Sequence, residues 1–254
     1  MSQEDVKRFW DKKAADGTIK QEVTHSDIYQ RMLEIDSIRS FLRPDDTVLD
    51  IGCGNGYSTR RFAGSIKSIL GLDYSQEMID QARKAEDNPP NVSYRVCDIR
   101  EADGIEPGTF SAAITERCLI NLADWEEQQQ AILNIHKSLE VGGTYVFCEG
   151  KENGRRGLNE LRKKLGLEEM PKVWHNVDFE EKRTREFLSK YFDIEKELSF
   201  GMYDLISRVV HPLAVQPNEP QYDSAMNQIA YRMNVLMNDH ADISRVLFLV
   251  LKKR

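Results

Sequence analysis

A glycine-rich turn directly after a short apolar strand is the feature that most constrains the fold of this chain. Residues Val48-Leu-Asp-Ile-Gly-Cys-Gly-Asn-Gly56 place glycines at positions 52, 54 and 56. Glycine permits a tight turn and lets a ligand approach the backbone, because it has no Cβ. The helix expected from Ser58 offers unpaired N–H groups at its start. The spacing therefore predicts a strand–turn–helix unit with a ligand at the end of its strand.

The residues around this turn favour a compact, positively charged ligand over a dinucleotide. Dinucleotide enzymes place G-x-G-x-x-G at this position, with one more residue before the third glycine than this chain has. Asp50 lies two residues before the first glycine, where its charge would repel a pyrophosphate and attract an ammonium group. The turn alone does not identify the ligand, but the turn together with Asp50 predicts a zwitterionic ligand.

Two further acidic residues end the next two predicted strands. Asp73 lies 21 residues after Gly52, at the position where an acidic side chain accepts hydrogen bonds from both ribose hydroxyls. Asp98 follows the third strand, where a carboxylate can accept from the exocyclic amine of adenine. Each acid alone could equally cap a helix or face solvent, but three at successive strand ends favour a cofactor site. The residues expected to form apolar walls around the base are Tyr74, Met78 and Ile99.

The order of strand and helix patterns predicts an α/β domain with a largely parallel sheet. The pattern is regular over residues 45–150 and less regular afterwards. The expected strands cover residues 47–51, 65–72, 92–96, 110–115, 144–148, 194–200 and 246–251. The expected helices cover residues 58–63, 76–83, 123–139 and 180–192.

Four segments together carry a family resemblance: VLDIGCGNG, GLDYS, VCDIRE, and a Gly-Gly turn before YVFCEG. They resemble the class I S-adenosylmethionine-dependent methyltransferases, strongly over residues 44–150 and weakly elsewhere. The resemblance implies a Rossmann-like sheet of seven strands in the order 3-2-1-4-5-7-6, with strand 7 antiparallel and helical insertions after strands 5 and 6. It implies one domain over residues 1–254. Its parts would be a helical cover (1–43), a cofactor-binding core (44–150) and substrate-side insertions (151–178 and 201–242).

The resemblance also implies the cofactor, S-adenosylmethionine, and the side chains around it. By position, Asp50 and Gly52 would face the methionine part, Asp73 the ribose, and Asp98 with Ile99 the adenine. Residues after the fourth strand would contact cofactor and acceptor together. The complete predicted cofactor set is Asp50, Gly52, Cys53, Gly54, Asp73, Tyr74, Met78, Asp98, Ile99 and Glu116.

The acceptor is expected beyond the carboxyl ends of the strands and in the two insertions. Residues 151–176 carry seven Lys and Arg against four Glu, which favours an anionic acceptor with Arg162 as a bidentate clamp. A solvated helix face is the alternative reading, and it is preferred for Lys163 and Lys164. The predicted substrate-binding residues are Arg117, Asn121, Asn159, Arg162, Trp174, Asn176, Tyr203 and Arg208.

A hydroxyl acceptor would also need a group that removes its proton. His175 and His211 are candidates because histidine titrates near neutral pH. Glu149, directly after the fifth strand, is the competing base. Each has a structural alternative, since a histidine can be a core residue and a strand-end carboxylate can cap a loop.

Charge and composition narrow the class of partner. The chain has 35 Lys and Arg against 42 Asp and Glu, a net charge of −7, whereas nucleic-acid binders normally present a net basic face. No apolar run reaches the roughly 18–20 residues that span a bilayer, and the polar start MSQEDVKRFWDKK does not resemble a secretory signal. We therefore expect a cytoplasmic protein with no nucleic-acid partner and no membrane insertion. No metal is expected, since no Cys and His cluster has zinc-ligand spacing.

The sequence thus predicts a methyltransferase for a small polar acceptor, a sugar or other metabolite that can be anionic, with O-methylation favoured. N-methylation of a small amine stays open, as does a different transfer or sulfonium modification at the same cofactor site. A nucleotide-dependent oxidoreductase and a non-catalytic adaptor are the remaining rivals. Whether the protein forms an oligomer is left open.

Overall fold

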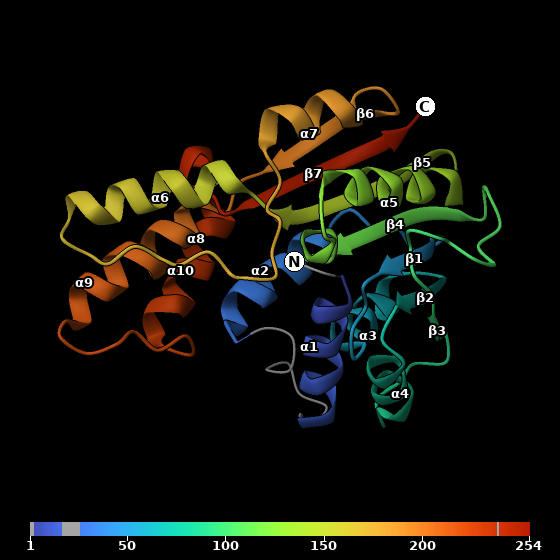
Figure 1. The fold of residues 1–254 in the computed structure, drawn as a ribbon, viewed down its shortest axis with the longest axis horizontal. Helices are drawn as coiled ribbons and strands as arrows, with labels where there is room; N and C mark the ends of the chain where they lie inside the picture. Colours follow the sequence, from blue (N-terminus) through green and yellow to red (C-terminus); the bar gives the residue numbers. More distant parts are fainter. Residues whose placement is uncertain (1–2, 17–25, 238) are drawn as a thin grey trace.

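The computed structural model describes residues 3–16, 26–237 and 239–254. Within these ranges one seven-stranded sheet has the order β3-β2-β1-β4-β5-β7-β6 (Figure 1), as predicted. The strands are β1 (Thr47–Ile51), β2 (Ser68–Asp73), β3 (Val92–Val96), β4 (Phe110–Glu116), β5 (Leu139–Gly150), β6 (Phe192–Leu198) and β7 (Val246–Lys253). Strand β7 is antiparallel to both of its neighbours, and the other pairs are parallel.

Side chains just before several helices explain where those helices begin. Asp27, Ser75 and Asp124 each accept a hydrogen bond from the backbone N–H three residues further on, which satisfies a donor that has no partner within the helix. None of the helices in the described ranges is long and apolar enough to cross a membrane. The helices are α1 (Gln3–Asp16), α2 (Ile28–Arg39), α3 (Tyr57–Phe62), α4 (Gln76–Lys84), α5 (Trp125–Ser138), α6 (Glu152–Lys164), α7 (Glu181–Leu188), α8 (Gly201–Leu205), α9 (His211–Val215) and α10 (Ala225–Leu236).

Helices cover both faces of the sheet, and successive residues of β1 belong to different cores. Val48 is fully buried in a cluster with Ile38 of α2 and Phe62 of α3. Leu49, the next residue, is fully buried in the cluster on the other face, with Ile132 of α5. Because side chains alternate along a strand and both faces are covered, the strand reads as a continuous apolar run.

The parallel strands end toward a group of helices that the two predicted insertions supply. In Figure 1 the arrowheads of β4 and β5 point toward α6, α8, α9 and α10, which we call the helical lobe. Helix α6 follows β5 and the other three follow β6. Ligands of open α/β sheets bind beyond the carboxyl ends of the strands, so the fold places the site between the sheet and this lobe.

Most predicted boundaries are shifted by one or two residues, and three differences are larger or have a local cause. Strand β5 begins at Leu139 rather than at residue 144, because Leu139 already pairs with Phe110. The register of the two strands shifts after this pair, and Gly142 in β5 has a φ of +73°. Strand β2 begins at Ser68 because residues 63–65 form a 3-10 turn. The helix predicted over 180–192 ends at Leu188, after which β6 begins at Phe192.

Candidate active site

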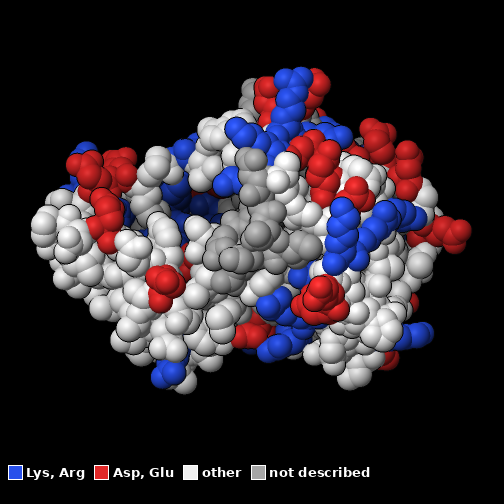
Figure 2. All heavy atoms as spheres, turned by 90° about the horizontal axis from the view of Figure 1, so that it is seen from below, with Lys and Arg blue, Asp and Glu red and all other residues white. Residues whose placement is uncertain are grey.

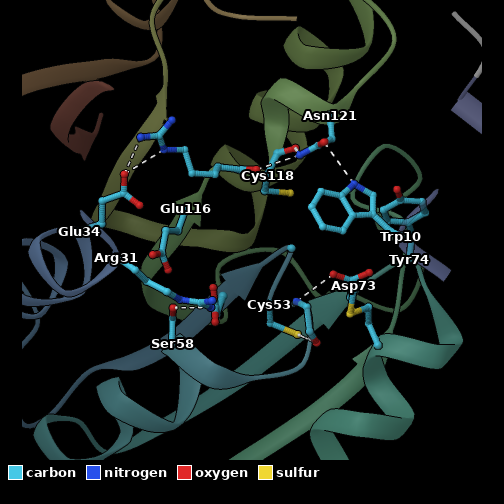
Figure 3. Close-up of a pocket in the computed structure, with 15 residues that line it drawn as sticks. Trp10, Arg31, Glu34, Cys53, Ser58, Asp73, Tyr74, Glu116, Cys118 and Asn121 are labelled. Carbon is cyan, nitrogen blue, oxygen red and sulfur yellow. Dashed lines mark hydrogen bonds and ion pairs between the residues drawn. The ribbon is translucent and has the colours of Figure 1, made fainter. Parts of the chain in front are cut away.

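A cavity at the carboxyl ends of β1, β2 and β4 collects most of the predicted cofactor residues, and we call it the cofactor cavity. Helices α1 and α2 complete its wall. Figure 3 shows two groups of side chains at its opposite ends, Arg31, Glu34 and Glu116 at one and Trp10, Tyr74 and Asp73 at the other. The predicted cofactor residues that line it are Asp50, Gly52, Cys53, Gly54, Asp73, Tyr74, Met78 and Glu116.

The glycine turn has a conformation that only glycine adopts readily. The φ angles of Gly52, Gly54 and Gly56 are +73°, +54° and +74°, in the left-handed region. The N–H of Gly52 donates to the carbonyl of Leu72 at 2.8 Å, which holds the turn against the end of β2. A Cβ at Gly52 would lie 2.3 Å from the sulfur of Cys118. Both the backbone angle and the close approach therefore require glycine at position 52.

Asp73 connects this turn to the start of α4. One carboxylate oxygen accepts from the N–H of Gly54 and the other from the N–H of Ser75, both at 2.9 Å. The residue is buried, and burial raises its pKa to about 6. Each oxygen keeps a further lone pair with which it can accept a hydrogen bond from a ligand.

The other end of the cavity brings one buried guanidinium close to two carboxyl groups, those of the buried Asp50 and the partly buried Glu116. Arg31 of α2 donates from Nη2 to Ser58 Oγ at 3.3 Å. Burial raises the pKa of Glu116 to about 7 and that of Asp50 to about 6, although Asp50 accepts a 2.6 Å hydrogen bond from Thr59 Oγ1. The pKa values of both acids therefore lie above the ordinary range because water is excluded from them.

These residues fit a ligand with an amino-acid group at one end. A ligand carboxylate would pair with Arg31, and a ligand ammonium would offset the burial of Asp50 and Glu116. At the other end the hydroxyl of Tyr74 is buried with no hydrogen-bond partner among the described residues. A buried polar group of this kind is usually satisfied by a ligand or water. The cavity therefore suits S-adenosylmethionine, which carries an amino-acid group at one end and a polar nucleoside at the other.

Asp98 lines a separate cavity, and Tyr74 borders both this cavity and the cofactor cavity. Burial disfavours the charged form of Asp98, but the hydrogen bonds that Arg100 donates to it, one of 2.6 Å, outweigh burial. They hold the pKa of Asp98 below its usual range. Glu4 of α1 lines the same cavity, so α1 covers both. Ile99 is buried in the core cluster that contains Leu49 and Ile132 and lines none of these cavities, so its place in the adenine wall stays a prediction.

A larger cavity, about 530 Å³ in volume, adjoins the cofactor cavity, and we call it the acceptor cavity. The two cavities share Trp10, Arg117 and Asn121. Trp10 donates from Nε1 to Asn121 Oδ1 at 3.3 Å, and Asn121 donates to the carbonyl of Arg117 at 2.9 Å. The guanidinium of Arg117 donates twice to Glu34, at 2.9 and 2.7 Å. These linked side chains lie where the two cavities adjoin.

Four of the predicted substrate-binding residues line the acceptor cavity, namely Arg117, Asn121, Asn176 and Arg208. The other four do not line it, and each has a structural role or faces solvent. Asn159 exchanges two hydrogen bonds with the backbone of Met170, and Arg162 donates to the carbonyls of Glu168 and Arg208. Tyr203 is fully buried and donates to Asp27 at 2.6 Å, whereas Trp174 is 55% exposed.

His175 is the one predicted base that lines the acceptor cavity. Its ring packs against Phe9 and Trp10 of α1, with centroid distances of 4.6 and 5.5 Å. Burial lowers the pKa of the imidazole, so the neutral form predominates at pH 7. Nδ1 is buried and has no hydrogen-bond partner within the described ranges. A neutral imidazole is a form that can accept a proton.

The other two predicted bases have structural roles. Glu149 is fully buried and accepts from the N–H groups of Cys118, Leu119 and Ile120 at 3.3, 3.0 and 3.3 Å. It lines neither cavity but holds the turn after β4 that carries Asn121. The ring of His211 is buried beside Asn227, with Nδ1 3.0 Å from its Oδ1, away from both cavities. The structure therefore does not support either residue as the base.

The sheet order, the glycine turn and the carboxylates at the strand ends define the class of this protein. Residues 48–143, from β1 into β5, match the sequence family described as a methyltransferase domain. The chain therefore carries a methyltransferase domain, with the sheet order of the class I S-adenosylmethionine-dependent methyltransferases.

Three known proteins show what the chain is similar to. It is 30% identical over 173 residues to the mRNA cap guanine-N(7) methyltransferase of Saccharomyces cerevisiae, covering 61% of this chain and 40% of that protein. It is 34% identical over 110 residues to an uncharacterized 37.1 kDa protein in transposon TN4556 of Streptomyces fradiae, covering 42% and 31%. It thus spans less than half the length of both curated relatives. An N-methyltransferase of Bradyrhizobium japonicum, solved with S-adenosyl-L-homocysteine, shares the fold with a TM-score of 0.59, 17% identity and 98% of each chain covered.

Proposed function

We propose that this protein transfers a methyl group from S-adenosylmethionine to an oxygen of a small polar molecule bound in the acceptor cavity. The observation that carries the proposal is that Trp10, Arg117 and Asn121 line both cavities, so that the two cavities adjoin. Ligands in the two cavities would lie next to each other, and methyl transfer depends on bringing two reactants together in line. When bound, the cofactor supplies an electrophilic methyl group on a sulfonium.

His175 is the base in this proposal. A hydroxyl group becomes a good nucleophile when its proton is removed during the reaction. The imidazole lines the acceptor cavity, and its burial favours the neutral form, so a ring nitrogen can take that proton. Phe9 and Trp10 hold the ring in place through their packing.

The test is a transfer assay with the His175→Gln variant. The purified protein is incubated with S-adenosylmethionine and a panel of polar metabolites, and mass spectrometry identifies products that gain one methylene unit. We expect His175→Gln to lower the rate by roughly 100-fold or more, with the affinity for S-adenosylhomocysteine unchanged.

His136→Gln is the matched control. This histidine of α5 also packs on aromatic rings, 5.7 Å from Tyr191 and 5.2 Å from Phe192, and burial also lowers its pKa. It lines neither cavity, so its variant should keep the full rate. A normal rate in His175→Gln would refute the role of His175 as the base. A product with any other mass gain would refute methyl transfer.

Methylation of a nitrogen is the second candidate function, and the similarity to the Saccharomyces cerevisiae mRNA cap guanine-N(7) methyltransferase favours it. A ring nitrogen attacks through its own lone pair and needs no base. In that case GTP or a capped dinucleotide would accept the methyl group, and His175→Gln would keep its rate. The net charge of −7 counts against a long RNA substrate, which is why we place this candidate second.

A further inference from the structure

The lining of the acceptor cavity carries more basic than acidic side chains, although the protein as a whole is acidic. Figure 2 shows a hollow with Lys and Arg side chains in its depth. Its acidic lining residues are Asp27 and Asp178 alone among the described residues. The cations that line the cavity are Lys13, Arg117, Lys151, Arg155, Arg208 and Arg245. They outnumber the acids even when Glu34, Glu181 and Asp204, which pair with three of them, are counted.

Two of these arginines converge on one neutral oxygen. Gln30 Oε1 accepts from Nη2 of Arg208 at 3.2 Å and from Nη2 of Arg245 at 2.8 Å. The two guanidinium groups are therefore held side by side, and like charges at such short range repel each other. Asp27 pairs with Arg208 and Asp204 pairs with Arg245, so these buried acids offset part of the repulsion. An anion bound to both arginines would offset more of it.

One guanidinium nitrogen of Arg208 donates to no acceptor in the described part of the chain. The residue is 6% exposed, and it pairs with Asp27 through Nη2. Nη1 is buried and has no hydrogen-bond partner among the described residues. Burying a charged donor without a partner is costly. The protein therefore maintains, at the lining of the cavity, a cation whose hydrogen-bonding capacity its own residues do not fill.

We propose that the acceptor carries an anionic group, a carboxylate or a phosphate, which binds in the acceptor cavity to Arg155, Arg208 and Arg245. The proposal rests on the proposed function, because it takes this cavity as the acceptor site. Guanidinium groups bind both anions through two parallel hydrogen bonds. The sequence predicted this role for Arg162. That side chain instead supports the site from outside, since it donates to the carbonyl of Arg208.

The experiment titrates the protein, saturated with S-adenosylhomocysteine, with inorganic pyrophosphate and with citrate at constant ionic strength. Isothermal calorimetry gives the affinity, and the stronger of the two ligands shows which anion the site prefers. Arg155→Gln is the first variant, because this side chain lines the cavity and is partly exposed. Arg156→Gln is its matched control, a neighbouring exposed arginine outside the lining. Arg208→Lys, which keeps the charge beside Asp27, is the second variant.

We expect saturable binding to one site, weakened about tenfold by Arg155→Gln and by Arg208→Lys and unchanged by Arg156→Gln. No saturable binding at millimolar ligand, or equal affinities of the wild type and Arg155→Gln, would overturn the proposal. So would a transfer assay in which neutral acceptors react as well as their carboxylated or phosphorylated counterparts. Bound pyrophosphate with no methyl transfer to any acceptor would refute the proposed function, which separates the two failures.

Discussion

Replacing Asp73 with alanine tests the assignment of the cofactor cavity without knowledge of the acceptor. The carboxylate lies at the end of β2, and its two oxygens accept from the N–H groups of Gly54 and Ser75 at 2.9 Å each. The residue lines the cofactor cavity, and each oxygen keeps a further lone pair for a ligand. If they accept from the ribose hydroxyls of the cofactor, the variant loses charge-assisted hydrogen bonds to it.

The expected loss of affinity for S-adenosylhomocysteine is roughly 1–3 kcal/mol, which is about 5- to 150-fold in the dissociation constant. The variant also leaves two N–H groups without their acceptor, at a cost of roughly 1–3 kcal/mol each. Removing a carboxyl whose pKa burial raises to about 6 offsets part of that cost. We therefore expect a lower melting temperature but a folded protein, since domains typically have about 5–15 kcal/mol of stability.

Asp46→Ala is the matched control. Asp46 is exposed to the same extent as Asp73, 8%, and accepts from Arg43 N–H and Ser111 Oγ at 2.7 Å each. It precedes β1, at the opposite end of the sheet, and lines neither cavity. Both variants should melt earlier than the wild type, but calorimetry should show weaker binding of S-adenosylhomocysteine only for Asp73→Ala.

Two results would refute this reasoning. A folded Asp73→Ala protein that binds S-adenosylhomocysteine within about twofold of the wild type would show that the carboxylate does not contact the cofactor. An equal loss of affinity in Asp46→Ala would show that the effect is one of general stability.

Two further substitutions test the glycine turn and the partly buried acid beside it. Gly52→Ala should lower the free energy of unfolding in urea by roughly 1–3 kcal/mol, because φ is +73° and the new Cβ would lie 2.3 Å from Cys118 Sγ. Gly64→Ala, with no atom within 4 Å of its Cβ, should change stability little, and equal losses would contradict the strain. Burial raises the pKa of Glu116 to about 7, so its contribution to stability is complete below about pH 4.5 and is lost as the pH rises through 7. Between pH 5 and 8 the cofactor-free wild type should lose up to roughly 3 kcal/mol relative to Glu116→Gln, and parallel pH profiles of the two proteins would refute the raised pKa.

The cofactor side of the site was predictable because its signals are local. A glycine turn after an apolar run and an acid at the end of the next strand are short patterns. The order of strands then brings them together, since β1 and β2 pair in parallel and their ends meet at one edge. One local signal was overlooked, namely Arg100, two residues after Asp98, which binds that carboxylate.

The acceptor side depends on contacts between distant segments, and the sequence could not rank its candidates. His175 and His211 look alike in the sequence, but only His175 reaches the cavity, where α1 packs on it. Glu149 has a structural role because its carboxylate accepts from N–H groups about 30 positions away in the sequence, in the turn after β4. Arg31, on a helix with no motif around it, joins the cofactor cavity only because α2 packs beside β1.

The sequence by itself therefore determined the sheet and the glycine turn, because hydrophobic periodicity and backbone geometry act over a few residues, and its resemblance to a family implied the cofactor. Only the tertiary structure decided which basic residues line the larger cavity. The sequence favoured Arg162 as the anion ligand, but the fold turns Arg162 toward backbone carbonyls and places Arg208 in the lining of that cavity. The physical reason is that a charged side chain takes its role from the partners that surround it, and distant segments of the chain supply those partners.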